Sequence, residues 1–382
     1  MKIALINLGL DTNYGGSLQR FALYTVLTKM GYDVTYIPYI DTHYAPRGLK
    51  RAFSKFKRLL YKYILRKEVL NKNGIPLSIY EKAAEKEAKL QIPIFLEFAR
   101  KYVKCWNVIY HRLDDIREVE SSFDAFVVGS DQVWRTGNPI FFLDFVSPTK
   151  KKVAYAVSFG NKGESYNNKL IDKMRKLVRR FDAVSFREEM GLELSKEFKW
   201  DYAHHPKLTL DPTLLLKADD YLKTFKLSNK VIDNSLFYYV LDNSESINQF
   251  IIHISSSLGL VAHGIDTLMP NLYKTTELRL PSPEQWVESI FKAKFVITDS
   301  FHGTMFSIIF NKPFITIQNE ERGAFRYYPL LNQLGLSNRL VRKGDLENLV
   351  ISELAPIDWE IVNNKIEVMR KDSLSFIKQA LN

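Results

Sequence analysis

The sequence begins with MKIALINLGLDTNYGGSLQRFALYTVLTKMGYDVTYI (residues 1–37), and this stretch decides the class of fold. An apolar run at residues 2–7 is followed by a loop with two glycines and then by apolar side chains spaced along one helix face. A second apolar run follows at residues 33–37. A strand, a glycine loop, a helix and a strand within about 35 residues begin a parallel α/β unit. The stretch has no G-x-G-x-x-G, so it does not predict dinucleotide binding.

The same alternation continues along the whole chain. Strands with a turn signal after them are predicted at 124–134, 152–161, 182–191, 236–241, 260–264, 294–298 and 314–317. Helices are predicted at 169–180, at 244–258, from 281 onward and at 358–381. Strands that alternate with helices predict parallel sheets.

We therefore predict an α/β protein with two Rossmann-like domains that face a cleft. The first domain covers residues 1–217, with a basic helical insertion near 47–102, and a polar linker follows at 218–234. The second domain covers residues 235–357. The C-terminal helix, residues 358–382, is expected to return to the first domain.

Composition and charge limit the class of protein. With 382 residues, 46% hydrophobic and 25% charged, the chain is long enough for two globular domains and is not disordered. The formal net charge of +11 favours an anionic partner. Cys105 is the single cysteine, which excludes an internal disulfide and favours a cytosolic protein. No apolar run is long enough to predict a membrane-spanning helix.

The segment from Arg47 to Lys67 is basic and amphipathic. It holds nine Lys or Arg and no acidic residue, with apolar side chains at roughly helical spacing. One interpretation is a surface helix whose apolar face lies on the core; the other is a helix that contacts an anionic membrane or a lipid-linked substrate.

The stretch FVITDSFHGTMFSIIFNKPFITI (295–317) is the clearest candidate for a functional site. It places Ser300, His302, Gly303 and Thr304 where a buried strand passes into the next helix. Helix N-termini attract anions, a glycine admits a ligand close to the backbone, and histidine transfers protons near neutral pH. Alternatively, His302 is a structural histidine bonded to a carbonyl group.

Other candidates follow further strand ends or carry a guanidinium. Two groups of polar and glycine residues are candidate substrate contacts: Asn13, Gly15, Gly16, Ser17 and Gln19, with Ser17 as a helix N-cap, and Ser130, Asp131 and Gln132. Arg187, Arg322 and Arg326 could grip a carboxylate or phosphate with a bidentate fork, or form surface salt bridges. No metal-ligand spacing occurs, so no metal is predicted.

Several segments in order resemble the polysaccharide pyruvyl transferase family. They are NYGGSLQRFALYTVLTKMGYDV, FVVGSDQVW, AYAVSFG, VSFREEMG, LDPTLLL and TDSFHGTMFSIIFNKPF, between residue 13 and about residue 317. The resemblance implies two domains arranged as in glycosyltransferases of the GT-B type. It also implies transfer of pyruvate from phosphoenolpyruvate to two hydroxyls of one sugar as a cyclic ketal, with release of phosphate.

The resemblance implies roles for individual residues. His302 is the candidate general acid, and Arg187 is the candidate clamp on the donor's carboxylate or phosphate. Some branches of the family have an arginine two positions before the histidine, where this chain has Ser300, so Arg322 or Arg326 is a candidate to replace it.

The family context gives further expectations. Phosphoenolpyruvate is expected as co-substrate with no other cofactor. The acceptor is a sugar of a bacterial surface polysaccharide or capsule, which a lipid carries at the inner face of the cytoplasmic membrane. Nucleic acid is not expected as a partner. The alternatives are a GT-B-type glycosyltransferase that uses a nucleotide sugar, or a non-catalytic polysaccharide-assembly protein, because fold does not fix function.

Replacing Lys55, Lys57, Arg58 and Lys62 by Gln tests the membrane interpretation of the basic segment. Each basic residue near an anionic bilayer contributes about 1 kcal/mol, so sedimentation with anionic vesicles should weaken markedly while sedimentation with neutral vesicles stays the same. Unchanged binding to anionic vesicles would assign the segment to packing within the protein.

Overall fold

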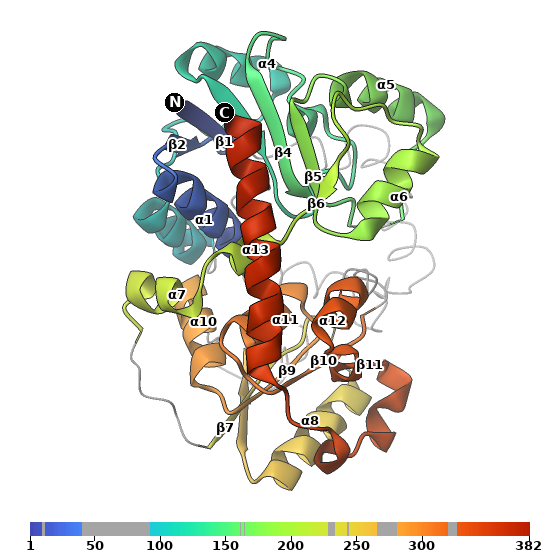
Figure 1. Cartoon of the computed structure of the whole chain (residues 1–382). Helices are drawn as coiled ribbons and strands as arrows, with labels where there is room; N and C mark the ends of the chain where they lie inside the picture. The colour runs from blue at the N-terminus through green and yellow to red at the C-terminus, as the bar shows by residue number, and fades with distance from the viewer. Residues whose placement is uncertain are drawn as a thin grey trace, which may run out of the picture.

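The computed structural model describes residues 1–9, 12–39, 92–160, 162–163, 165–227, 234–242, 244–265, 281–319 and 327–382. These residues form two α/β domains, which lie one above the other in Figure 1, each built on a parallel sheet. The fold class predicted from the alternation of strands and helices is confirmed.

The first domain contains a six-stranded sheet in the order β2-β1-β3-β4-β5-β6. The described strands of this sheet pair in parallel; β1, for example, pairs with β2 through Lys2 and Asp33 and with β3 through Ile3 and Ala125. Most residues of the inner strands are buried, as expected where helices cover both faces of a sheet. The strands are β1 (Lys2–Ile6), β2 (Asp33–Tyr36), β3 (Ala125–Val128), β4 (Lys151–Val157), β5 (Ala183–Phe186) and β6 (Lys207–Leu208).

Helices connect these strands. Residues 92–102 are helical, and they are the described part of the insertion predicted near 47–102; the basic segment 47–67 lies outside the described residues. The named α-helices are α1 (Tyr14–Lys29), α4 (Leu113–Ile116), α5 (Asn168–Val178), α6 (Glu189–Glu197) and α7 (Ala218–Phe225). Short 3₁₀ helices are η3 (Arg117–Ser122), η4 (Pro139–Phe142) and η5 (Pro212–Leu215).

Helix α1 begins three residues earlier than the predicted N-cap. Asn13 is the N-cap, and its side chain accepts a hydrogen bond from the Gly16 amide at 3.0 Å. Gly15, Gly16 and Ser17 are therefore inside the helix, and the prediction that Ser17 caps it is wrong. Asparagine caps as well as serine does, and two glycines in succession made the first turn look like a loop.

The second domain contains a five-stranded parallel sheet in the order β11-β10-β9-β7-β8. Its strands are β7 (Ser235–Tyr239), β8 (Val261–Gly264), β9 (Phe295–Thr298), β10 (Phe314–Ile317) and β11 (Leu340–Val341). Its helices are α8 (Glu245–Leu258), α10 (Pro283–Lys292), α11 (Phe301–Ile309), α12 (Tyr328–Leu334) and the 3₁₀ helices η7 (Ser337–Arg339), η8 (Lys343–Asn348) and η9 (Ile351–Glu353). The two-residue strands β6 and β11 were not predicted, since two residues show no periodicity.

Part of the stretch predicted as a linker is ordered structure. Residues 218–225 form α7, in which Tyr221 and Phe225 are buried, while residues 228–233 lie outside the described part of the chain. The polar composition of this stretch predicted a linker instead of a helix. Two buried aromatic side chains are nevertheless enough to anchor the helix to the core.

Helix α13 (Trp359–Leu381) leaves the second domain and runs along the first, as Figure 1 shows. The Leu210 amide donates a hydrogen bond to the Ser373 hydroxyl at 3.0 Å. The Phe376 and Tyr155 rings pack with their centroids 6.2 Å apart. The predicted return of the C-terminal helix to the first domain is confirmed.

The two domains share one hydrophobic core. A single cluster of buried side chains contains residues of both sheets, together with α1, α10, α11 and α13. At its centre Tyr14 of the first domain stacks on Trp286 of the second, with ring centroids 5.6 Å apart and an interplanar angle of 11°. The Tyr14 hydroxyl donates to the Pro281 carbonyl at 2.8 Å. Such an apolar contact resists relative motion of the domains.

Within the described ranges, no helix combines the length and the apolar character needed to cross a bilayer.

Replacing Trp286 by Ala should destabilise both domains together. Trp286 is fully buried, so its removal leaves a cavity and should lower the free energy of unfolding by about 3 to 5 kcal/mol. Urea unfolding followed by circular dichroism measures this loss. Val368→Ala, at an exposed position on α13, is the control and should stay within about 0.5 kcal/mol of the parent. Equal stabilities for the two variants would contradict a shared core.

Candidate active site

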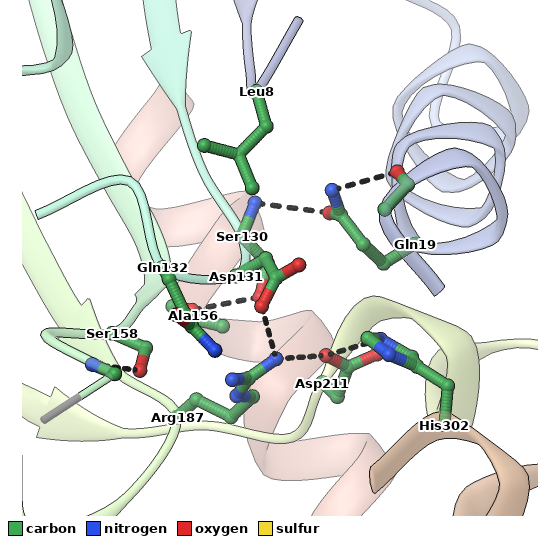
Figure 2. Close-up of polar contacts among 12 residues, drawn as sticks. Leu8, Gln19, Ser130, Asp131, Gln132, Ala156, Ser158, Arg187, Asp211 and His302 are labelled. Atoms are coloured by element: carbon green, nitrogen blue, oxygen red, sulfur yellow. Dashed lines mark hydrogen bonds and ion pairs between the residues drawn. The ribbon is translucent and has the colours of Figure 1, made fainter. Parts of the chain in front are cut away.

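Three polar side chains from different elements meet where the domains touch (Figure 2). Arg187 follows β5, Asp211 is the N-cap of η5, and His302 lies in the first turn of α11. Arg187 Nη1 lies 3.0 Å from Asp211 Oδ2, and His302 Nε2 lies 3.6 Å from the same oxygen. The first domain thus supplies the guanidinium and the carboxylate, and the second supplies the imidazole.

Arg187 is enclosed by carboxylates. Nη1 also pairs with Asp131 at 3.3 Å, and Nε pairs with Glu188 at 3.2 Å. Its side chain is 2% exposed, and its guanidinium carbon lies 4.4 Å from the centroid of the Phe301 ring. Burial lowers the pKa of Arg187, but the three carboxylates raise the pKa by more, so it lies above its ordinary value.

Only one end of the Arg187 guanidinium remains for a ligand. Among the described residues Nη2 has no hydrogen-bond partner, whereas Nε and Nη1 are paired. The geometry therefore does not provide the free bidentate fork that the sequence predicted. The reason is that three carboxylates already pair with this guanidinium. Asp131 and Asp211 are distant from Arg187 in the sequence, and its neighbour Glu188 gave no sign of the pairing.

Asp211 is the residue that sequence reasoning missed. Its Oδ1 accepts hydrogen bonds from the Thr213 amide at 3.0 Å and the Thr213 hydroxyl at 2.7 Å, which leaves Oδ2 to Arg187 and His302. Burial raises the pKa of Asp211, but His302, Arg187 and the Thr213 amide lower the pKa by more, so it lies well below its usual range. The sequence signal was Asp-Pro-Thr, an N-cap pattern that gave no hint of its spatial partners.

His302 packs against the first turn of α1. A Cβ added to Gly15 would lie 1.9 Å from His302 Nδ1, so only glycine permits the imidazole in this place. Gly15, a predicted substrate contact, thus makes room for the histidine of the other domain. Nε2 has no hydrogen-bond partner among the described residues and faces Asp211.

The polar residues near α1 and β3 support this centre. Gln19 Nε2 donates to Asn7 at 2.6 Å, and Gln19 Oε1 accepts from the Ser130 amide at 3.2 Å. The Ser130 hydroxyl donates to the Ala156 carbonyl at 2.7 Å. These bonds fix the chain that leads into Asp131, so the predicted contacts Gln19 and Ser130 position a partner of Arg187.

The remaining predicted contacts near the first sheet have other partners. Ser17 Oγ accepts from Arg20 at 3.2 Å, and Asn13 caps α1. Gln132 accepts from Arg135 Nη1 at 2.9 Å and lies beside Gly160, at which an added Cβ would be 2.5 Å from the Gln132 side chain.

The N-terminus of α11 is already capped. The Gly303 amide donates to the Ser300 hydroxyl at 3.3 Å, and the Thr304 hydroxyl donates to the Ser300 carbonyl at 3.1 Å. A Cβ at Gly303 would lie 2.4 Å from Thr298 Oγ1. Glycine is therefore required at 303 because the backbone packs there against a strand side chain, and the contact of Gly303 with a ligand stays a prediction. Arg322 and Arg326 lie outside the described residues.

One hollow adjoins the centre and a second opens beside the first, and His302 lines neither. A small cavity of about 140 Å³ is lined by Arg187, Asp211 and Phe301 together with residues of α12 and α13. A larger open cleft of about 750 Å³ lies between α6 and the second domain. Glu189 and Pro329 line both, so the cleft leads toward the buried charges. In the described part of the chain, no group of three His, Cys, Asp or Glu residues is placed to hold a metal ion.

The fold and this site define a two-domain α/β protein whose candidate catalytic groups come from both domains. The family model for polysaccharide pyruvyl transferase matches residues 13–321, which include strands of both sheets. The chain therefore belongs to the polysaccharide pyruvyl transferase family. A search of curated proteins found no match.

Two solved structures illustrate the similarity in the course of the chain. A UDP-GlcNAc 2-epimerase from Neisseria meningitidis bound to UDP-GlcNAc is 12% identical, with a TM-score of 0.47, covering 100% of this chain and 99% of its own. The spinosyn rhamnosyltransferase SpnG complexed with thymidine diphosphate is 11% identical, with a TM-score of 0.45 and 100% of both chains covered. Neither likeness bears on the activity of this protein.

Replacing Gly15 by Ala should displace the His302 ring, since the added methyl would occupy its place. Overpacking of this kind lowers stability by about 1 to 3 kcal/mol, which thermal unfolding measures. Gly344→Ala is the matched control, because no atom lies within 4 Å of its added methyl. If the two variants unfolded at the same temperature, His302 would not be packed on α1.

Proposed function

We propose that this protein transfers pyruvate from phosphoenolpyruvate to two hydroxyls of one sugar in a surface-polysaccharide precursor, forming a cyclic ketal and releasing phosphate. Membership of the polysaccharide pyruvyl transferase family supports the reaction type. The observation that carries the proposal is the meeting of His302 with Asp211 and Arg187 inside the matched residues. A proton-transfer group at the junction of two domains can serve a reaction between two substrates.

His302 is proposed as the group that moves protons. The protonated imidazole gives its proton to the methylene carbon of phosphoenolpyruvate, and a cation-like centre forms at the carbon that bears the carboxylate. The first sugar hydroxyl attacks this carbon and returns a proton to His302. Phosphate then leaves, the second hydroxyl closes the ring, and the second hydroxyl's proton leaves with the phosphate. One histidine therefore acts as acid and as base.

The charges around His302 suit this chemistry. Asp131, Glu188 and Asp211 outnumber the single guanidinium of Arg187, so the centre carries negative charge close to the imidazole. Negative charge stabilises a cation-like carbon. Negative charge does not attract the anionic phosphoenolpyruvate. We therefore propose that Arg187 mainly holds the carboxylates in place, and that Nη2 is the N–H group that it has left for a ligand. Arg322 and Arg326 stay candidates for the carboxylate and phosphate of phosphoenolpyruvate.

The open cleft beside α6 is proposed to take the acceptor. Tyr328, Asn338 and Arg342 line it together with the carboxylates Glu189, Glu193 and Asp345. An aromatic ring can cover one face of a sugar, and amide, carboxylate and guanidinium groups hydrogen-bond its hydroxyls. A lipid carrier on the acceptor, and contact with an anionic membrane through residues 47–67, complete the proposal.

Acceptor-dependent release of phosphate from phosphoenolpyruvate tests the proposal directly. General acid catalysis contributes about 10² to 10⁴ in rate, so His302→Ala should lower the release by that factor. His253→Ala, which changes an exposed histidine of α8, is the control and should release phosphate at the parent rate. A His302→Ala rate within about threefold of the parent would contradict the catalytic role.

Ligand-induced stabilisation separates pyruvyl transfer from glycosyl transfer. A ligand at about 100 times its dissociation constant adds roughly 2.7 kcal/mol to stability. Phosphoenolpyruvate should raise the unfolding temperature more than inorganic phosphate does. Stabilisation by a nucleotide sugar alone would replace the proposal with glycosyl transfer.

A further inference from the structure

We infer that Asp211 is a positioning residue that keeps a proton on Nε2 of His302 and leaves Nδ1 to exchange a proton with the substrate. The inference concerns the proton on one imidazole, and its catalytic consequence rests on the proposed function. The supporting observation is that each oxygen of the Asp211 carboxylate has its own set of partners.

The carboxylate of Asp211 cannot turn freely. Oδ1 holds both the amide and the hydroxyl of Thr213, at 3.0 and 2.7 Å, and Oδ2 holds Arg187 Nη1 at 3.0 Å. The side chain is buried, so no solvent competes for these bonds. The oxygen that faces His302 is therefore fixed in direction before any substrate arrives.

This fixed oxygen selects one form of the neutral imidazole. Oδ2 is ionised, because the pKa of Asp211 lies well below its usual range, and an ionised carboxylate oxygen only accepts hydrogen bonds. A proton on Nε2 points toward Oδ2, whereas a lone pair on Nε2 would face negative charge in a buried place. In a neutral imidazole, one nitrogen carries the proton and the other accepts.

Nδ1 is consequently the nitrogen available for proton exchange. It lies beside Gly15, in the first turn of α1, and away from the Asp211 carboxylate. Protonation of His302 adds its second proton at Nδ1, and this is the proton that the methylene carbon of the donor would receive. The inference thus places the reacting carbon next to the N-terminal turn of α1.

Asp211→Asn should reverse the tautomer. The Thr213 amide and hydroxyl require an acceptor, so the amide oxygen of the new side chain takes the place of Oδ1. Its NH₂ group then takes the place of Oδ2, where Arg187 Nη1 loses one acceptor but keeps Asp131 at 3.3 Å. Nε2 faces the NH₂ group and must accept, so the proton of the neutral imidazole moves to Nδ1. Asp and Asn side chains have nearly the same shape, so a reversed tautomer would result from the change in charge and hydrogen bonding and not from a change in packing.

The experiment reads the tautomer from long-range ¹H–¹⁵N spectra of the full chain labelled with [¹⁵N]histidine. Spectra are recorded at increasing pH until the His302 signals no longer change, so that the neutral form is observed. The signals of His302 are those lost in His302→Gln. The parent should show the proton on Nε2, and Asp211→Asn should show it on Nδ1. Asp220→Asn makes the same chemical change at the start of α7 and should retain the parent pattern.

Each result of this experiment decides the inference. A proton on Nδ1 in the parent overturns it without any variant, and a proton on Nε2 in both the parent and Asp211→Asn overturns it as well. Because the spectra need no substrate, the inference is judged even if the parent releases no phosphate. That outcome would refute the proposed function alone.

Turnover provides the second measurement. If the parent is active, Asp211→Asn should lower kcat by about 10² to 10⁴ while the KM for phosphoenolpyruvate stays within about threefold, because Asp211 acts through His302. Parent-like kcat in a variant with a reversed tautomer would show that Nδ1 is not the atom that exchanges the proton, which would overturn that part of the inference.

Discussion

The buried carboxylate of Asp211 is the constraint on which the rest of the site depends. An ionised carboxylate in the interior is strongly unfavourable unless it is paired and hydrogen-bonded. Asp211 satisfies this requirement with Arg187 and Thr213 of its own domain and with His302 of the other. The site is therefore complete only when the domains are docked, and the shared apolar core around Tyr14 and Trp286 provides the docking.

The same docking explains the composition of the first helical turn. His302 lies where a side chain at residue 15 would be, so the second residue of the helix must have no Cβ. Glycine in a helix lowers its stability by about 1 kcal/mol relative to alanine, and the Asn13 cap and the packing of Tyr14 offset this loss. Helix stability thus favours alanine at position 15, whereas the packing of His302 requires glycine. The chain has glycine, so the tertiary contact outweighs helix propensity here.

Arg187 shows how an arginine can hold several carboxylates together at one site. Its guanidinium holds three carboxylates in place, and the excess negative charge lies beside an imidazole that would carry a proton. In the proposed reaction the carbon that bears the carboxylate becomes cation-like, and nearby negative charge would stabilise it. The proposal assigns the attraction of the anionic donor to other cations of this basic chain.

The sequence by itself determined the α/β class, nearly all strands of four or more residues, and the importance of the segment that contains His302. These features depend on periodicity and local turn chemistry, which neighbouring residues express. Only the tertiary structure decided that Asp211 faces His302, that Gly15 makes room for it, and that Arg187 is already paired. The two relations of His302 join residues about 90 and nearly 300 positions apart across a domain interface. The carboxylates of Arg187 belong to its own domain, and two of them come from other loops. No local pattern records these partners, because burial and charge select them after the chain has folded.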